Sequence, residues 1–329
     1  IGDDSKFIVD RFIEFLEEDK KNAFSTPFFA ALWFHAPHGP FVSPPEYLEP
    51  ARELVMKLPD PGKCGIIFDE SVGFSDSKSC QGTLKDANLC EEICIQVKAH
   101  YYGSVMALDE QVGRVRQYLK DNDLYENTVI IFSSDNGPAR YDANRQPRYI
   151  GPGSAAHLEE WKFSVFEGGT RVPMVIEYPG LVASNRVVGY PATNVDYLPT
   201  VLDLLNVPYP ENAMGHVLDG ISLVPHIAGV KRPRVKPIGI VNVDRDIIFL
   251  MNSSAVVKLY KKSETIYTFD SSEDRFVEAK QESSEDQGID DFFEVWYDKV
   301  FDPSPCNKQD DKDGVDPETC IDETTSDYF

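Results

Sequence analysis

The sequence lacks any uninterrupted apolar run near the ~18–20 residues of a membrane-spanning helix, so we expect no membrane span in this segment. It is also short of basic residues, with 32 Lys and Arg against 55 Asp and Glu and a formal net charge of −23. This imbalance argues against nucleic acid as a partner, because nucleic-acid binding needs basic patches. The 329 residues, 42% of them hydrophobic, suffice for one large α/β domain and a smaller one.

The negative charge is uneven, and most of it lies after Glu264. Runs of like charge are usually solvated surfaces or tails. Because residues 302–329 are also poor in apolar side chains, we expect them to form a loosely ordered acidic tail.

Three polar segments each adjoin an apolar run that is typical of a buried strand. The first of these runs, 128–132, is β-branched, which predicts a parallel strand, and it leads into the segment 133–137. There Asp135 and Asn136 offer hard oxygen ligands suited to Ca²⁺ or Mg²⁺, and Gly137 permits a tight turn beside a ligand. An ordinary Asp-Asn-Gly turn explains the same residues.

The other two segments carry imidazole and ammonium groups. The apolar run 28–34 leads into His35 and His38, whose spacing fits a zinc pair, structural turn histidines or ligand contacts alike. Lys162 opens the segment that precedes the apolar run 174–178, and a surface position is the ordinary explanation for a lysine.

In chain order the three segments read HAPHGP, FSSDNG and K-x-x-x-FEGGTRVP, which resembles the type I sulfatases of the alkaline-phosphatase-like superfamily. The resemblance covers residues 5–260. It implies an α/β fold: a sandwich with a mostly parallel central sheet between helices, plus a small C-terminal antiparallel-sheet subdomain. The expected division is a partial catalytic domain at 1–230, with a Cys- and Pro-rich insertion at 41–97, then the subdomain at 231–301 and the tail.

The resemblance also assigns roles. Asp135 and Asn136 become ligands of a divalent cation, Ca²⁺ with Mg²⁺ as the alternative. Lys162 and His35 become catalytic sulfate contacts, with His35 a candidate proton donor to the leaving oxygen. His38 is either a substrate contact or a supporting residue. Arg171 is expected to pair with a carboxylate such as Glu167 and to hold the loop.

The family's nucleophile is a formylglycine made from Cys-x-Pro-Ser-Arg or Ser-x-Pro-Ser-Arg, and neither element occurs in this sequence. The early Asp pair of the family's metal site is absent too, since no apolar strand precedes Asp3 and Asp4. We therefore expect the chain, which opens on Ile1, to be the C-terminal part of a longer sulfatase and to be inactive alone. A pseudoenzyme is the alternative.

The implied activity is hydrolysis of sulfate esters, with a sulfated small molecule or sulfated glycan as substrate. A phosphodiesterase or phosphonate hydrolase of the same superfamily is the rival within enzymes. A sulfatase-like chain that binds its ligand without catalysis is the rival from another class.

The six cysteines, at positions 64, 80, 90, 94, 306 and 320, form an even set that fits disulfides in a secretory, lysosomal or extracellular hydrolase. We expect at least one disulfide among the first four, although free thiols or zinc ligands are possible for these residue types. The pairing cannot be deduced from spacing.

Apolar periodicity predicts helices at 5–21, 98–121, 193–205 and 289–300, with Ser5 capping the first. Alternating runs predict a small antiparallel sheet from 238–243, 247–251, 255–260 and 265–269.

Overall fold

A computed structural model describes nearly two thirds of the chain and divides it into two compact units, Ile1–Gly180 and Leu181–Phe329. The expected helix at 289–300, the acidic tail and five of the six cysteines lie outside the residues whose side chains are described. No helix in the described part is long and apolar enough to cross a membrane. The described residues are 3–62, 87–139, 152–182, 185–209, 218–230, 234, 236–241, 247–251, 257–261, 266–270 and 275–278.

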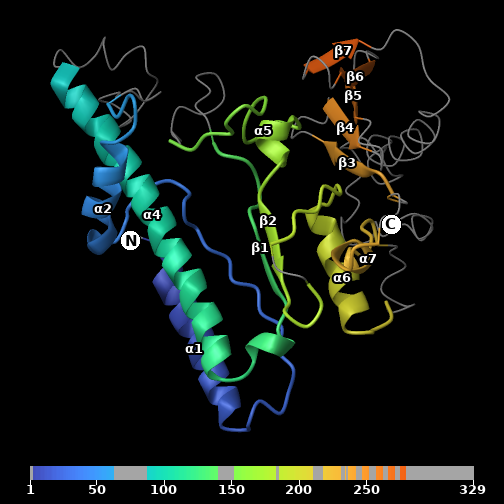
Figure 1. Cartoon of the computed structure of the whole chain (residues 1–329). Helices are drawn as coiled ribbons and strands as arrows, with labels where there is room; N and C mark the ends of the chain where they lie inside the picture. Colours follow the sequence, from blue (N-terminus) through green and yellow to red (C-terminus); the bar gives the residue numbers. More distant parts are fainter. Residues whose placement is uncertain are drawn as a thin grey trace, which may run out of the picture. The chain divides into compact units, whose positions relative to one another are not determined.

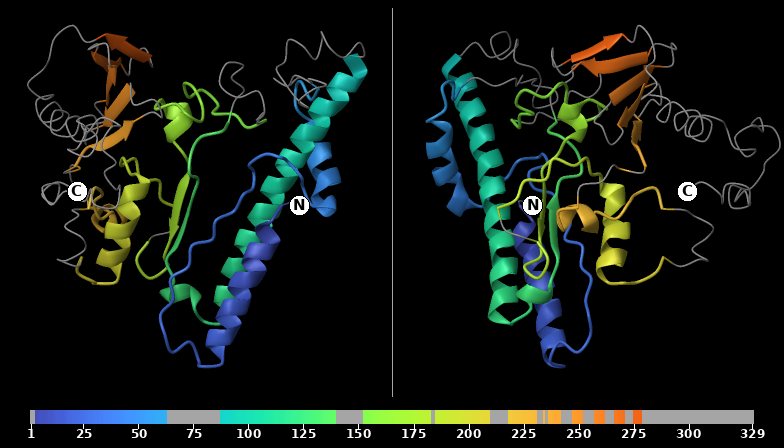
Figure 2. Two further views of the ribbon diagram at one scale, coloured as in Figure 1. Left: turned by 180° about the vertical axis from the view of Figure 1, so that it is seen from behind. Right: turned by 45° about the vertical axis from the view of Figure 1, so that its right-hand side comes forward.

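Three helices form the framework of the first unit (Figures 1 and 2). Helices α1 (Ser5–Lys20) and α2 (Pro45–Val55) both pack along α4 (Ala87–Asp121). The first helix is confirmed, whereas α4 begins eleven residues before the expected start and takes in part of the presumed insertion. Proline opens α2, as is common at a first helical position, but Pro50 lies inside it, so the prolines do not exclude a helix here.

Two apolar clusters hold these helices together. Phe12 and Leu16 of α1 meet Leu119 of α4 in one buried cluster. Val55 of α2 meets Ile95 and Ala99 of α4 in the other. Burial of side chains of this size contributes about 1.5–3 kcal/mol each, so the clusters fix both short helices against α4.

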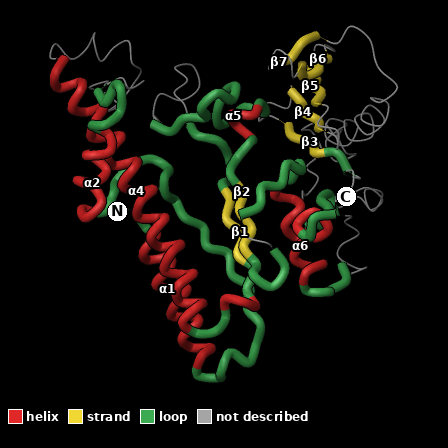
Figure 3. Tube along the Cα trace, in the orientation of Figure 1, coloured by secondary structure: helices red, strands yellow, loops and turns green. Residues whose placement is uncertain are grey.

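The segment 28–34 is not the buried strand that its composition predicts. It has no regular secondary structure and is drawn as loop in Figure 3. Phe28 and Leu32 pack against the α1–α4 cluster, while Phe29 and Trp33 are 80% and 84% exposed. An extended chain directs successive side chains to opposite faces, so only one face of this segment is covered by the described residues.

Strands β1 (Ile130–Ser133) and β2 (Met174–Glu177) form a two-stranded sheet. Their pairing is antiparallel, with Phe132 opposite Val175, and no parallel pair occurs in the described part of the chain. The parallel central sheet is therefore not shown by the described residues, in which β2 is the one partner of β1. A β-branched run is typical of a buried strand in a parallel sheet, but it does not identify the partner on each edge of the strand.

A charged cluster attaches this sheet to α4. Arg116 donates from Nε and Nη2 to the two carboxylate oxygens of Glu177, both at 2.7 Å, and Tyr125 donates to the same carboxylate. The Arg116 guanidinium, helped by the Tyr125 hydroxyl, holds the pKa of Glu177 below its ordinary value of 4.5. A carboxyl group whose pKa is lowered by folding stabilises the folded state at pH values above its ordinary pKa. This contribution is lost as the pH falls through the lowered pKa.

Replacing Glu177 with Gln should therefore weaken the dependence of the free energy of unfolding on pH in the acidic range. Above pH 5 the variant should be less stable than wild type, and the difference should shrink as the pH is lowered below 4.5. Urea unfolding at a series of pH values measures it, with Glu53→Gln on the exposed side of α2 as control. Parallel pH profiles for wild type and Glu177→Gln would contradict the assignment.

The second unit contains short helices and a five-stranded sheet in the order β3-β4-β5-β6-β7, antiparallel throughout. This confirms the small antiparallel sheet and adds a fifth strand to it. The expected helix at 193–205 appears as η2 followed by α6, opened by a capping box of Thr193 and Asp196. The remaining bounds are η1 Tyr125–Asn127, α5 Glu167–Thr170, η2 Asn194–Asp196, α6 Tyr197–Leu204, α7 Val224–Ile227, β3 Ile238–Val241, β4 Ile247–Met251, β5 Val257–Lys261, β6 Ile266–Asp270 and β7 Arg275–Glu278.

Asp196 is the centre of polar packing in the second unit. Its oxygens accept two 2.8 Å bonds from Arg234, and the two side chains are 0% and 1% exposed. The same carboxylate accepts the backbone N–H groups of Thr193 at 2.9 Å and Ile221 at 2.8 Å. A buried ion pair with this many hydrogen bonds defines the loop geometry because no other arrangement satisfies both charges.

Asp196→Ala should destabilise the second unit strongly, by about 3–5 kcal/mol, because Arg234 is left buried without its counter-charge. Thermal and urea unfolding measure the loss. Glu18→Ala breaks an exposed pair with Lys21 and should change stability by no more than about 1 kcal/mol. Equal effects of the two substitutions would show that Asp196 is not the buried centre described.

Candidate active site

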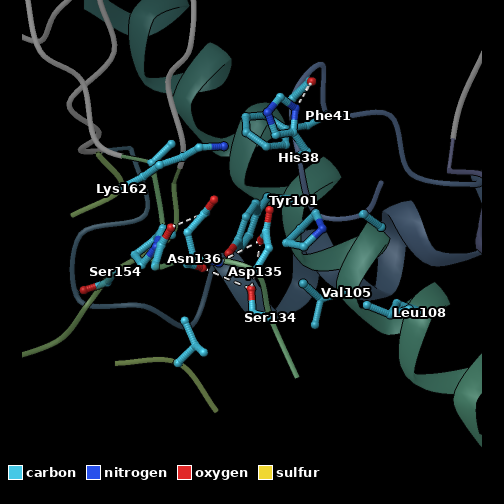
Figure 4. A pocket seen from close by; sticks show the side chains of 18 of the residues that line it. His38, Phe41, Tyr101, Val105, Leu108, Ser134, Asp135, Asn136, Ser154 and Lys162 are labelled. Carbon is cyan, nitrogen blue, oxygen red and sulfur yellow. Dashed lines mark hydrogen bonds between the residues drawn. The ribbon is translucent and has the colours of Figure 1, made fainter. Parts of the chain in front are cut away.

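One pocket in the first unit, with a volume of about 1340 Å³, is lined by residues of all three sequence motifs. Figure 4 shows several of them from close by, with Lys162 extending into the pocket from one side and His38 lying on another. The motif residues that line it are His35, His38, Asp135, Asn136, Lys162 and Arg171.

The turn after β1 presents two oxygen atoms. Asp135 accepts the backbone N–H of Asn136 at 2.9 Å through Oδ1, which leaves its Oδ2 without a hydrogen bond to any described residue. The Asn136 amide donates from Nδ2 to the Gly137 carbonyl at 2.9 Å, so its Oδ1 is the atom left for a ligand. In Figure 4 both side chains rise into the pocket from this turn.

These two oxygens fit a hard divalent cation in chemical type. Ca²⁺ takes about 6–8 oxygen ligands and Mg²⁺ about six, so two side chains supply only part of a coordination shell. The described residues contain no group of three or more His, Cys, Asp or Glu side chains that could hold a metal ion. Asp135 and Asn136 are therefore suited to contribute to a cation site and cannot complete one.

Backbone hydrogen bonds join this turn to the glycine-rich loop. The N–H of Gly137 donates to the Gly169 carbonyl at 2.8 Å, and the N–H of Lys162 donates to the Pro138 carbonyl at 3.0 Å. The loop closes on itself through the Gly168 N–H and the Glu159 carbonyl, at 2.7 Å. Lys162 is thus tied by its own backbone to the turn that carries Asp135.

The glycines are required by this close approach. A Cβ placed on Gly137 would lie 1.8 Å from the Gly168 carbonyl oxygen, and one on Gly168 would lie 2.0 Å from the Glu160 carbonyl oxygen. Gly137 does not adopt a left-handed conformation, so its role differs from the tight turn that the sequence suggests. It allows two backbone segments to touch where a side chain would separate them.

Lys162 is half-buried and places its ammonium 5.6 Å from the centre of the Phe163 ring. The ammonium forms no hydrogen bond or ion pair with the described residues. Phe163 has a φ of +78°, which is rare for a bulky residue and marks a sharp change of chain direction immediately after the lysine. The result is a cation at the pocket wall with no protein counter-charge among the described side chains.

The two histidines have different hydrogen-bond partners. His38 Nδ1 lies 2.6 Å from the carbonyl oxygen of Gly39. The Nδ1 of His35 is bonded to a carboxylate oxygen of Asp4, at the start of α1, and the His35 backbone N–H donates to the other oxygen at 3.3 Å. Asp4 is not expected from the sequence to be a metal ligand, and its contact with His35 is not predictable either, because nothing in local spacing joins positions 4 and 35.

Arg171 and Tyr101 also line the pocket. Arg171 pairs with Glu167 at 3.1 Å, as expected. Tyr101 of α4 lines the pocket and was missed, because the apolar period of the helix at 98–121 does not identify which aromatic side chain faces a pocket. Burial raises the pKa of Tyr101, whose ring packs edge-on against Phe41 at 5.5 Å. This gives the pocket an aromatic wall beside its charged groups.

A family model described as Sulfatase matches residues 2–207, which is more than half of the chain. The chain belongs to the sulfatase family. This sulfatase is 32% identical over 161 residues to arylsulfatase K of Danio rerio, a match that covers 49% of the chain and 26% of the relative. The curated relatives in general are matched over less than half of their own length.

Solved structures support the fold. A protein solved in complex with its substrate D-glucosamine-2-N,6-O-disulfate aligns with a TM-score of 0.57 and 19% identity. The match covers 93% of the chain and 71% of that structure. The phosphonate monoester hydrolase of Silicibacter pomeroyi also gives 0.57, at 18% identity, over 90% of the chain and 60% of that structure. At these identities the sulfatase shares an alkaline-phosphatase-like fold with both, and the likeness does not choose between their chemistries.

Cys94 of the sulfatase is buried and disulfide-bonded. The other cysteines lie outside the residues whose side chains are described, so the pairing among Cys64, Cys80, Cys90 and Cys94 stays a prediction.

Gly137→Ala should destabilise the first unit, because the added methyl group meets a backbone oxygen that cannot rotate away. Overpacking of this kind costs about 1–3 kcal/mol. Gly113→Ala in α4 is the matched control, since a Cβ there meets nothing within 4 Å, and it should be neutral or stabilising by up to about 1 kcal/mol. Thermal unfolding compares the two, and a Gly137→Ala protein as stable as wild type would refute the close packing.

Proposed function

We propose that this sulfatase chain supplies cation ligands and sulfate-binding groups for the hydrolysis of sulfate esters. The observation that carries the proposal is the convergence in one pocket of oxygen ligands and an ammonium that have no hydrogen-bond or ion-pair partner among the described residues. Asp135 and Asn136 offer the oxygens, and Lys162, tied by its backbone to the same turn, offers the positive charge.

Each residue has a separate task in the proposal. Asp135 Oδ2 and Asn136 Oδ1 would hold a divalent cation, Ca²⁺ or alternatively Mg²⁺, which when bound offsets negative charge on the sulfuryl oxygens. Lys162 binds one of those oxygens, because an ammonium is a compact point charge. A histidine, His35 in the first instance, gives a proton from Nε2 to the leaving oxygen, while His38 contributes a further substrate contact.

The residues assigned above do not include the nucleophile of the proposed reaction. The resemblance to type I sulfatases implies formylglycine, and the sequence elements from which it is made do not occur in these 329 residues. The substrate class we propose is a sulfated small molecule or sulfated glycan, and the location a secretory, lysosomal or extracellular one. The bound disulfated glucosamine of the similar structure and the disulfide at Cys94 are consistent with these proposals.

A substrate panel separates sulfatase from phosphonate or diester hydrolase activity. The enzyme that contains this chain should hydrolyse p-nitrophenyl sulfate with a higher kcat/KM than bis-p-nitrophenyl phosphate or an aryl phosphonate monoester. Preferential turnover of either phosphorus compound would overturn the proposal, because the fold is common to both kinds of enzyme.

Lys162→Ala should lower kcat/KM for p-nitrophenyl sulfate far more than it lowers stability. Loss of one preorganised contact to a transition-state charge costs on the order of 10²–10³ in rate, whereas surface substitutions usually change stability by about 0.5 kcal/mol or less. Lys162→Arg should rescue poorly, because a planar guanidinium needs different geometry. Steady-state kinetics with thermal unfolding measure both, and near-normal kcat/KM for Lys162→Ala would place the lysine outside the site.

A further inference from the structure

Asp4 lies at a position where an aspartate side chain usually caps a helix. It is the N-cap residue of α1, and aspartate at an N-cap normally accepts an N–H of the first helical turn. Here the Asp4 side chain makes no capping hydrogen bond. Its backbone carbonyl still accepts the N–H of Ile8 at 3.0 Å, so the helix begins normally while the carboxylate points elsewhere.

The preceding residue takes over the capping role. Asp3 accepts the backbone N–H of Ser5 at 3.2 Å and the Ser5 hydroxyl at 2.5 Å. Asp3 is itself held by its N–H, which donates to the Val42 carbonyl at 3.0 Å. Ser5, expected to cap the helix, instead lies in its first turn as a donor. The Asp3 carboxylate therefore bonds to the first turn of α1, and the Asp4 carboxylate can bond to a different partner.

That partner is His35, thirty-one positions away. One Asp4 oxygen contacts His35 Nδ1 and the other accepts the His35 backbone N–H at 3.3 Å. The imidazole is 88% exposed and has no other hydrogen bond to a described residue, whereas Asp4 is 28% exposed. A largely exposed ring on a loop is free to rotate, so this carboxylate is the restraint on its direction.

We propose that Asp4 is a positioning residue that orients His35 for the sulfatase reaction. An ionised carboxylate only accepts hydrogen bonds, so the neutral imidazole keeps its proton on Nδ1 and leaves Nε2 for the pocket. In the proton transfer, the Nε2–H bond of the imidazolium breaks and an O–H bond forms on the leaving oxygen. The ring is left neutral in the Nδ1–H form, and Asp4 takes no proton in this step.

This inference rests on the proposed function for its role in catalysis, but the orientation itself is testable without activity. Long-range ¹⁵N–¹H spectra of the labelled protein at pH 8, above the ordinary imidazole pKa of about 6.5, report which ring nitrogen carries the proton. His35→Gln identifies the signal among the six histidines. Wild type should show Nδ1–H, and Asp4→Asn should shift the population towards Nε2–H, since an amide can donate to Nδ1.

Activity supplies the second readout. In the enzyme that contains this chain, Asp4→Asn should lower kcat for p-nitrophenyl sulfate by about 10–100-fold with a smaller change in KM, as loss of an orienting partner typically does. Asp10→Asn is the matched control on the same helix, because Asp10 is 30% exposed and pairs with Lys6 and Arg114 instead of a histidine. It should leave kcat and the His35 signal unchanged.

The outcomes are distinct. An Nε2–H signal in wild type, an unchanged signal in Asp4→Asn, or equal losses of kcat in Asp4→Asn and Asp10→Asn would each overturn the positioning role. A shifted signal in Asp4→Asn together with absent sulfatase activity in wild type would overturn the proposed function and leave the Asp4–His35 orientation established.

Discussion

The contact between the backbones at Gly137 and Gly168 is the constraint on which the arrangement of the pocket depends. A side chain on Gly137 would lie within 1.8 Å of the Gly168 carbonyl oxygen, so the turn after β1 and the glycine-rich loop meet without any spacer. Because that contact is made by main chain, the hydrogen bond from Lys162 to Pro138 follows from it. The backbones that carry Lys162 and Asp135 are thus held close together by main-chain hydrogen bonds.

The charged groups of the pocket and those elsewhere in the described structure differ in whether they have an ion-pair partner. Arg116 and Glu177 satisfy each other with two hydrogen bonds, and Arg234 and Asp196 do so in full burial. In contrast, Lys162 and one oxygen of Asp135 have no such partner among the described side chains. Unpaired charges of opposite sign in one pocket are of little use to folding, because each is attracted to water as well as to the other. They are well suited to bind a ligand that carries charge and coordinates a cation, which is why we connect the pocket with sulfate.

Sequence reasoning was accurate where the signal is local. The apolar period located α1, alternation located β3 to β6, and the polar residues after apolar runs did line one pocket. It failed where a property depends on a distant partner. The antiparallel partner of β1 and the contact of Asp4 with His35 involve residues that are tens of positions apart in the sequence. The exposure of Phe29 and Trp33 is likewise not visible in the apolar run itself. The motif resemblance selected the candidate residues, and the hydrogen bonds that hold them are visible only in the folded structure.

The two sides of the pocket are held by forces of different kinds. Lys162 and Asp135 are placed by short main-chain hydrogen bonds in a region too tight for side chains, so neither salt nor pH acts on their position directly. His35 is placed by its side-chain contact with Asp4 at the surface, where the ring is 88% exposed, and a contact of this kind contributes little to stability. The orientation of the His35 ring therefore depends on a single side-chain partner, Asp4, whereas Lys162 and Asp135 are carried by backbone segments that are hydrogen-bonded to each other.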